Sequence, residues 1–138
     1  MARIGRSRPD WRQRGAAAVE LAIVMPLLFL VIAGIVDFGR FFLTEIQLTN
    51  AVREGARVAV IGEDLDDIRT RVLTAAPAVP GLTAGTVTVA SCAGAGSNAT
   101  VTATGDFDWI LLEPALNMFG AAGALPEATA EAVMRCGG

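Results

Sequence analysis

The chain has 138 residues, of which 53% are hydrophobic, and a formal net charge of −3. It contains no histidine, no tyrosine and no lysine. Without histidine there is no Ser-His or Cys-His catalytic pair and no histidine metal ligand, and without lysine there is no Schiff base. We therefore expect a protein that is not an enzyme and that holds no metal or cofactor.

An apolar run over residues 16–36 dominates the N-terminal part of the chain. It is 21 residues long, and Glu20 is its single charge. A helix rises about 1.5 Å per residue, so this run can cross a bilayer core of roughly 30 Å. Pro26 removes one backbone hydrogen bond inside the run, so we expect a kink there, with a local loss of helix as the alternative. The run predicts one membrane-spanning helix.

Charge is distributed unevenly on the two sides of this run. Residues 1–15 carry five arginines against one carboxylate, whereas residues 16–138 carry six arginines against thirteen carboxylates. Arginine-rich flanks stay in the cytoplasm, which places the N-terminus inside and the acidic remainder outside the cell membrane. We expect residues 1–15 to be disordered. Nucleic-acid binding is not expected, because the helix beside the arginines is apolar on every face.

The helix is predicted to continue out of the membrane, to about residue 60. Asp37 and Arg40 form an acid–base pair that, with the adjoining aromatic residues, suits the outer headgroup region. Glu54 and Arg57 are three residues apart and can pair on the exposed side. Small and apolar residues recur at steps of three, four and seven, which is typical of the buried face of a helix. They are Phe41, Leu48, Ala51, Val52, Gly55, Ala56 and Ala59.

The remaining residues predict a small α+β domain. A second helix begins at residues 63–67, where carboxylates fill the first turn. Alternating valines and threonines then predict antiparallel strands over residues 86–92 and 99–104. Alanine, glutamate and methionine in the tail favour helix by propensity, but we predict a third strand over residues 128–135. The expected fold is thus α+β: a long N-terminal helix, a short helix and a three-stranded antiparallel sheet.

Cys92 and Cys136 both fall on the predicted outer side of the membrane. An even number of cysteines in an oxidising compartment indicates one disulfide. The bond would tie the tail to the first strand, as a third strand there allows. In the chain-entropy picture a closed loop of about 45 residues is stabilising by about 4 kcal/mol. Two free, buried thiols remain the alternative.

Two further features lie between the second and third strands. Asp106 and Asp108 are two residues apart and would share one face of a strand. A hydrolytic carboxylate pair is conceivable, although an acidic strand end is the commoner pattern. Residues 109–119 include an apolar patch that could pack on the sheet, touch the bilayer or meet a partner protein. The sequence leaves these three roles open.

The start of the apolar run carries a more specific pattern, in which a basic leader ends in Gly15 and Glu20 follows five residues later. This pattern resembles the class III signal of type IV pilins and pseudopilins, which prepilin peptidase cuts after the glycine. The resemblance implies a cut between Gly15 and Ala16. It also implies that Glu20 serves assembly, because a carboxylate in hydrocarbon needs a partner and the freed amine of Ala16 would supply one.

A longer pattern runs over residues 14–60. Its residues are Glu20, Pro26, Asp37, Gly39, Arg40, Asn50, Ala51, Arg53, Glu54, Gly55, Ala56 and Arg57. This stretch is similar to the TadE-like family of pilin-like proteins in the tight-adherence (Flp pilus) apparatus, and the resemblance implies a pilin-like fold. With the patterns above, it divides the chain into a leader over residues 1–15, a transmembrane and assembly helix over 16–61, and a small extracytoplasmic domain over 62–138.

The function expected from this resemblance is that of a minor pilin-like structural component of a Tad pilus or secretion system. Its partners would be prepilin peptidase, other pilin-like subunits, the pilus assembly platform and the lipid bilayer. An uncleaved single-pass membrane protein, whose outer domain binds a ligand or partner, is the alternative. In that case Gly15 would be only a hinge, and Glu20 would reach the cytoplasmic headgroups.

Overall fold

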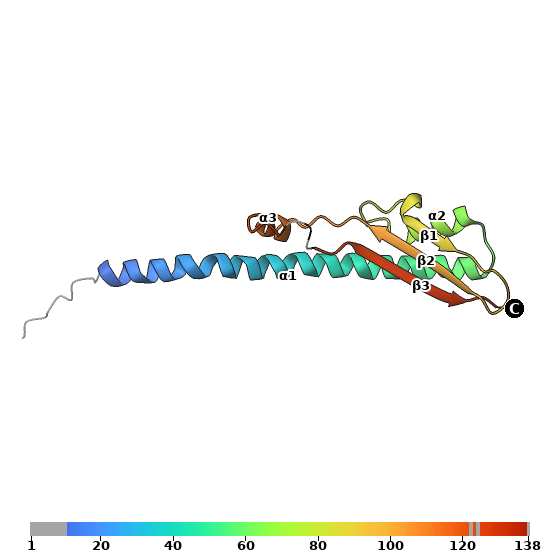
Figure 1. Cartoon of the computed structure of the whole chain (residues 1–138), viewed down its shortest axis with the longest axis horizontal. Coiled ribbons are helices and arrows are strands. Elements are labelled where there is room, and N and C mark those ends of the chain that lie inside the picture. Colours follow the sequence, from blue (N-terminus) through green and yellow to red (C-terminus); the bar gives the residue numbers. More distant parts are fainter. Residues whose placement is uncertain (1–10, 122, 124, 138) are drawn as a thin grey trace, which may run out of the picture.

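The computed structural model describes residues 11–121, 123 and 125–137. It consists of one long helix, a small sheet and two short helices (Figure 1). The expected α+β fold is therefore confirmed. In chain order the elements are α1 (Trp11–Val60), α2 (Leu65–Ala75), the 3-10 turn η1 (Ala84–Thr86), β1 (Val87–Ala90), β2 (Asn98–Gly105), α3 (Leu112–Asn117) and β3 (Ala128–Arg135).

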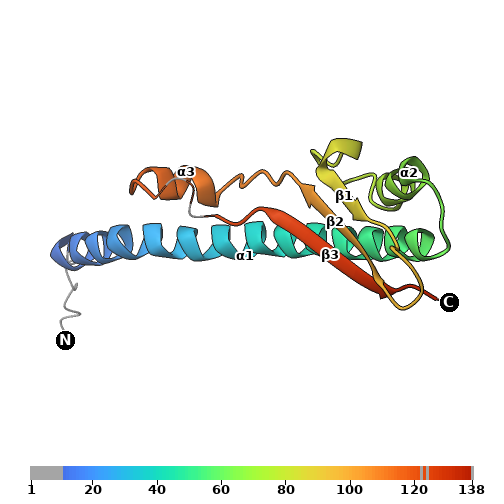
Figure 2. The ribbon, with the colours of Figure 1, turned by 45° about the vertical axis from the view of Figure 1, so that its right-hand side comes forward.

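Helix α1 is a single element of 50 residues. It continues through Pro26 without a break, and neither Figure 1 nor Figure 2 shows a sharp bend there, so the expected kink is not seen. The expectation of a disordered leader falls largely on residues 1–10, which lie outside the described residues. Residues 11–15, however, are helical. Arginine, glutamine and alanine favour helix, and extending an existing helix avoids the cost of nucleation.

The three strands form one antiparallel sheet in the order β1-β2-β3. Val101 in the central strand pairs with Val89 of β1 and with Ala132 of β3. The third strand lies where it was predicted, over residues 128–135. The first strand is shorter than predicted, because Thr86 belongs to η1 and its hydroxyl accepts a hydrogen bond from the Thr83 amide at 3.0 Å.

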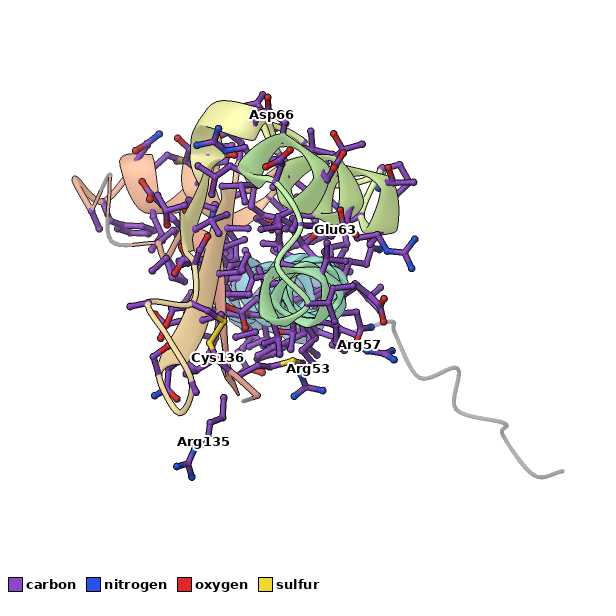
Figure 3. All side chains as sticks on the ribbon, turned by 90° about the vertical axis from the view of Figure 1, so that its right-hand side faces the viewer. Arg53, Arg57, Glu63, Asp66, Arg135 and Cys136 are labelled. Carbon is purple, nitrogen blue, oxygen red and sulfur yellow. A yellow bond between two sulfur atoms is a disulfide. The ribbon has the colours of Figure 1, made fainter. Side chains whose placement is uncertain are left out.

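The core lies between α1, the sheet and α2. The part of α1 that contributes to it runs from Asp37 to Val60 and is called the outer half, and the part before Asp37 is called the inner half. Figure 3 looks along α1 from its outer end and shows the sheet on one side of the helix and α2 on another. All seven residues of the predicted buried face of α1 are buried there. A Cβ at Gly55 would lie 2.5 Å from Cγ2 of Val72, so only glycine allows this approach of α2 to α1.

The region 62–138 has its core in common with α1. Helix α2 contributes Ile68 and Val72, and β2 contributes alternate small residues that face α1. On the exposed side, Glu54 pairs with Arg57 at 3.5 Å, as predicted, and also with Arg71 of α2 at 3.2 Å. The outer half of α1 is therefore the central element of the folded unit, while its inner half extends away from that unit (Figure 1).

Candidate functional site

The inner half of α1 projects from the folded unit (Figure 2). Every residue from 15 to 29 is exposed, although most of these residues are apolar. Within the described residues, α1 is the one helix that is long and apolar enough to cross a membrane. An apolar surface of this length is unfavourable in water and favourable in a bilayer or against other apolar helices.

The residues predicted for processing and assembly lie at the start of this exposed half. Gly15 and Ala16 are consecutive exposed residues within α1, and Glu20 is exposed about one turn further along. Nothing in the fold requires glycine at position 15, because an added Cβ would meet no atom within 4 Å. Alanine in its place would favour the helix by about 1 kcal/mol. The identity of Gly15 is thus explained by something other than packing.

A buried carboxylate, which the sequence did not reveal as such, lies at the boundary between the two halves of α1. Asp37 is completely buried. Its Oδ2 accepts hydrogen bonds from the backbone amides of Leu111 and Leu112, both at 2.8 Å, and its Oδ1 lies 3.5 Å from Nη1 of Arg40. The Asp37–Arg40 pair was predicted, but the two amides were not. These amides belong to residues 74 and 75 positions after Asp37. Every residue except proline has a backbone amide, so the contact leaves no pattern of side chains in the sequence.

Arg40 and a group of aromatic rings complete this attachment between α1 and the segment after β2. The guanidinium of Arg40 donates to the Asp108 carbonyl at 3.4 Å and lies 5.2 Å from the centroid of the Phe107 ring. Trp109 stacks on Phe41 with 5.2 Å between ring centroids. Together these contacts bring the chain from the sheet back onto α1, and Asp37 then binds the start of α3.

Helix α3 lies beside the inner half of α1, separate from the sheet (Figures 1 and 2). Between the two helices is an open groove of about 620 Å³. Its lining is entirely apolar and comprises Ile23, Pro26, Leu27, Phe29, Leu30, Ile32 and Ala33 of α1 with Leu111, Ala115, Met118 and Phe119. The patch whose role the sequence left open thus lies beside α1 rather than on the sheet, and its Met118 and Phe119 remain exposed.

The two carboxylates considered as a hydrolytic pair are not brought into one pocket. The Asp106 side chain occupies the space beside Gly81, where a Cβ would lie. Asp108 instead lines a separate pocket of about 230 Å³ with Arg40, Thr44 and other residues, and Asp106 is not part of that lining. This arrangement gives no support to the hydrolase alternative.

The predicted disulfide is present. Cys92 and Cys136 are bonded, with 5.9 Å between their Cα atoms. The bond connects the chain just after β1 to the chain just after β3, at the end of the sheet where β2 begins. The Cys136 amide also donates to the Ser97 carbonyl at 2.8 Å. The tail is therefore held to the rest of the sheet both covalently and by hydrogen bonds, and the free-thiol alternative is not observed.

A comparison with known proteins finds a match for helix α1, which carries Gly15, Glu20 and Asp37. Residues 15–57 match the family described as TadE-like protein. Over this segment the chain is TadE-like. The match includes the exposed residues Gly15, Ala16 and Glu20 and the buried Asp37, and it confirms the resemblance expected from the sequence. No curated protein and no solved structure matches the chain.

The TadE-like segment links this chain to proteins associated with the Tad pilus, and its apolar helix indicates membrane anchoring. The match ends at Arg57, three residues before the end of α1. It therefore covers both halves of α1, whereas α2, α3 and the sheet lie outside it. The family match thus concerns the long helix alone, and the structure adds the unit that is built on its outer half.

Proposed function

We propose that this TadE-like protein is a minor pilin-like structural subunit of the Tad apparatus, with no catalytic role. Prepilin peptidase would cut between Gly15 and Ala16, and α1 would then pack against the helices of other pilin-like subunits at the assembly platform. The N-terminus would face the cytoplasm and the folded unit would lie outside the cell membrane. The excess of arginine before the helix and of carboxylates after it supports this orientation.

The observation that carries the proposal is the division of α1 into two halves. One face of the outer half is buried under the sheet and α2, whereas residues 15–29 are all exposed in the isolated chain. A helix built in this way needs a second apolar environment. The bilayer supplies one before assembly, and neighbouring subunits supply another in a filament.

Exposed apolar residues also continue along α1 beyond the predicted span. They comprise Phe38, Phe42, Leu43 and Ile46, which are between 40% and 60% exposed. Ile46 lies ten residues past the end of the run at residue 36, or about 15 Å further along the helix. Such a stripe outside the bilayer is costly in water, so it supports contact with other subunits rather than anchoring alone.

Gly15 and Glu20 support the processing step. Glycine at position 15 is not needed for packing, and it lies close to the start of α1 at Trp11, where unwinding for a peptidase costs little. Cleavage would create a positive amine on Ala16, about one turn from the carboxylate of Glu20. A charged group in hydrocarbon costs about 3 kcal/mol when it has no partner, so the pair would be most favourable after cleavage.

One observation favours the alternative of an uncleaved single-pass anchor. Helix α1 begins at Trp11 and passes through Gly15 without interruption, so this end of the helix is formed before any cut. In such a protein the outer unit would bind a ligand or partner, and Glu20 would reach the cytoplasmic headgroups. The two functions differ in whether Glu20 is needed for assembly.

Substitution of Glu20 tests the proposed function. Glu20→Ala removes a charge that opposes membrane insertion, so the variant should insert at least as well as the native chain. Its incorporation into pili or the assembly apparatus should be strongly reduced, because the partner of the Ala16 amine is missing. Glu131→Ala is the matched control, since Glu131 is an exposed carboxylate on β3. Normal incorporation of the Glu20→Ala chain would overturn the assembly role.

A further inference from the structure

We propose that the α3 lobe, defined as residues 109–121, is embedded in the outer leaflet of the bilayer beside α1. Its partner is the acyl chains of the outer-leaflet lipids, which fill the groove between α3 and α1. This inference rests on the membrane placement of α1 in the proposed function. It adds a second membrane contact that comes from the C-terminal half of the chain.

The position of the lobe along α1 places it at the depth of the bilayer. Asp37, which holds the start of α3, follows directly on the apolar run at residues 16–36. The groove extends along α1 from Ala33 to Ile23. The outer half of the hydrocarbon core is about 15 Å thick. The part of the groove from Ala33 to Leu27 lies about 6 to 15 Å inward of Asp37 and so within that depth, whereas Ile23, about 21 Å inward, lies just past the midplane. If α1 crosses the membrane there, the lobe lies within the outer leaflet.

The side chains of the lobe match that environment. Ile110, Leu111, Met118 and Phe119 are 59%, 44%, 85% and 76% exposed, and all four are apolar. Between Asp108 and Glu127 the chain has a single charged residue, Glu113, near the start of α3. Glu113 follows directly on the residues bound by Asp37, at the level expected for the headgroups. The apolar residues lie on both sides of it, and the deepest ones bury nothing in the isolated chain.

The backbone of the lobe is suited to a medium without water, where an unpaired amide costs several kcal/mol. The first amides of the lobe helix, those of Leu111 and Leu112, donate to Asp37, and Pro114 has no amide hydrogen. After α3, each amide donates to a carbonyl within the lobe, with N–O distances of 3.0 to 3.4 Å. These donors are Met118, Phe119, Gly120 and Ala121.

Asp37 and Arg40 act as positioning residues for the lobe. Asp37 fixes the start of α3, and Arg40 binds both Asp37 and the Asp108 carbonyl just before the lobe. The charged pair and the rings of Phe41 and Trp109 lie where headgroups are expected, which is the depth that arginine and tryptophan favour. From this fixed point the chain continues inward along α1, as Figure 2 shows.

Photo-crosslinking in membranes tests the proposal with the full chain. Phe119→p-benzoylphenylalanine places a reactive ketone at the tip of the lobe, and Met118 offers a second, equally exposed position. Phe29 on α1 serves as the positive control, and Ile61 at the outer end of α1 as the negative control, since both are exposed. The chain is expressed without other pilus components, the membranes are irradiated, and adducts with phospholipid are measured by mass spectrometry.

We expect phospholipid adducts at positions 118 and 119 with a yield close to that at position 29. The yield should exceed that at Ile61 at least tenfold, because Ile61 lies about 36 Å outward of Asp37 along the helix. An adduct at 29 without one at 118 or 119 overturns the lobe proposal and leaves the proposed function intact. A crosslink at 119 only to a second copy or to another protein overturns it too. If position 29 gives no phospholipid adduct either, both the membrane placement of α1 and the proposal that the lobe is embedded in the bilayer are overturned.

Discussion

Asp37 is the residue on which the arrangement of the outer segments depends. It is buried, yet both of its carboxylate oxygens have donors. Two backbone amides from a segment more than 70 residues away donate to Oδ2, and Arg40 lies beside Oδ1. Hydrogen bonds to a charged group contribute more than neutral ones, and an amide left without its acceptor costs about 1–3 kcal/mol. One carboxylate on α1 thus determines where α3 begins.

Asp37→Ala should therefore release the α3 lobe. The two amides would lose their acceptor in a buried site, which should destabilise the attachment by about 3 kcal/mol. The measurement is the rate of limited proteolysis between residues 110 and 120 in the detergent-solubilised chain. Asp66→Ala is the control, because the Asp66 side chain on α2 is 96% exposed. Equal cleavage rates in the Asp37→Ala and native chains would contradict this role.

Gly55 and Gly39 allow a second comparison at the residue scale, within the same helix. A Cβ at Gly55 would press on Val72 of α2, whereas a Cβ at Gly39 would meet no atom within 4 Å. Gly55→Ala should lower the free energy of unfolding by about 1–3 kcal/mol through overpacking. Gly39→Ala should be neutral or stabilising by up to about 1 kcal/mol, because alanine favours helix. Urea unfolding in micelles measures both, and a stabilising Gly55→Ala would refute the close approach.

At the scale of elements, the disulfide joins the two outer strands of the sheet through their ends. The Cys92–Cys136 bond spans a sequence separation of 44 residues, and both β2 and the α3 lobe lie within that loop. Without the bond, the edge strand β3 would be held only by its hydrogen bonds to β2 and by its buried alanines. The bond keeps this strand in register with β2 even when the chain opens locally.

Replacing both cysteines with serine should destabilise the outer unit by about 4 kcal/mol, because the unfolded chain gains the freedom of the opened loop. The unfolding midpoint in urea, measured with and without reductant, checks this value. Reductant should shift the native protein toward the double variant and leave the double variant unchanged. An unchanged midpoint in both would show that the bond contributes nothing to stability.

Local pattern explains which elements the sequence could predict. In α1, the three- and four-residue steps predicted the buried face, because such steps come from neighbours on one element, which a single sequence records directly. The strand at 128–135 was predicted from the expected Cys92–Cys136 bond, since propensity favoured helix. In the structure its alanines at 128, 130 and 132 are buried and alternate with exposed residues.

The features that the sequence did not reveal depend on contacts between distant segments. Helix α3 is six residues long, too short for a periodic signal, and its start is fixed by Asp37 rather than by a capping residue of its own. The apolar patch at 109–119 was visible, but its place beside α1 follows from that one contact. For the same reason Asp37 was expected only as the partner of Arg40.

At the scale of the whole molecule, the protein is a long helix with a folded unit on its outer half. The folded unit uses α1 as its core, so the anchor and the outer unit cannot move independently (Figure 3). Any force or contact on the exposed half of α1 is passed directly to the sheet. This rigid coupling suits a subunit that is extracted from a membrane and packed into an assembly by its helix.

The central claim is that this helix becomes an assembly helix when the chain is cut after Gly15. The most direct measurement is the mass of the mature N-terminus, determined on the protein purified from cells with and without prepilin peptidase. We predict a chain that starts at Ala16 in the first case and an uncut chain in the second. A chain that starts at Met1 or Ala2 in the presence of the peptidase would contradict the account.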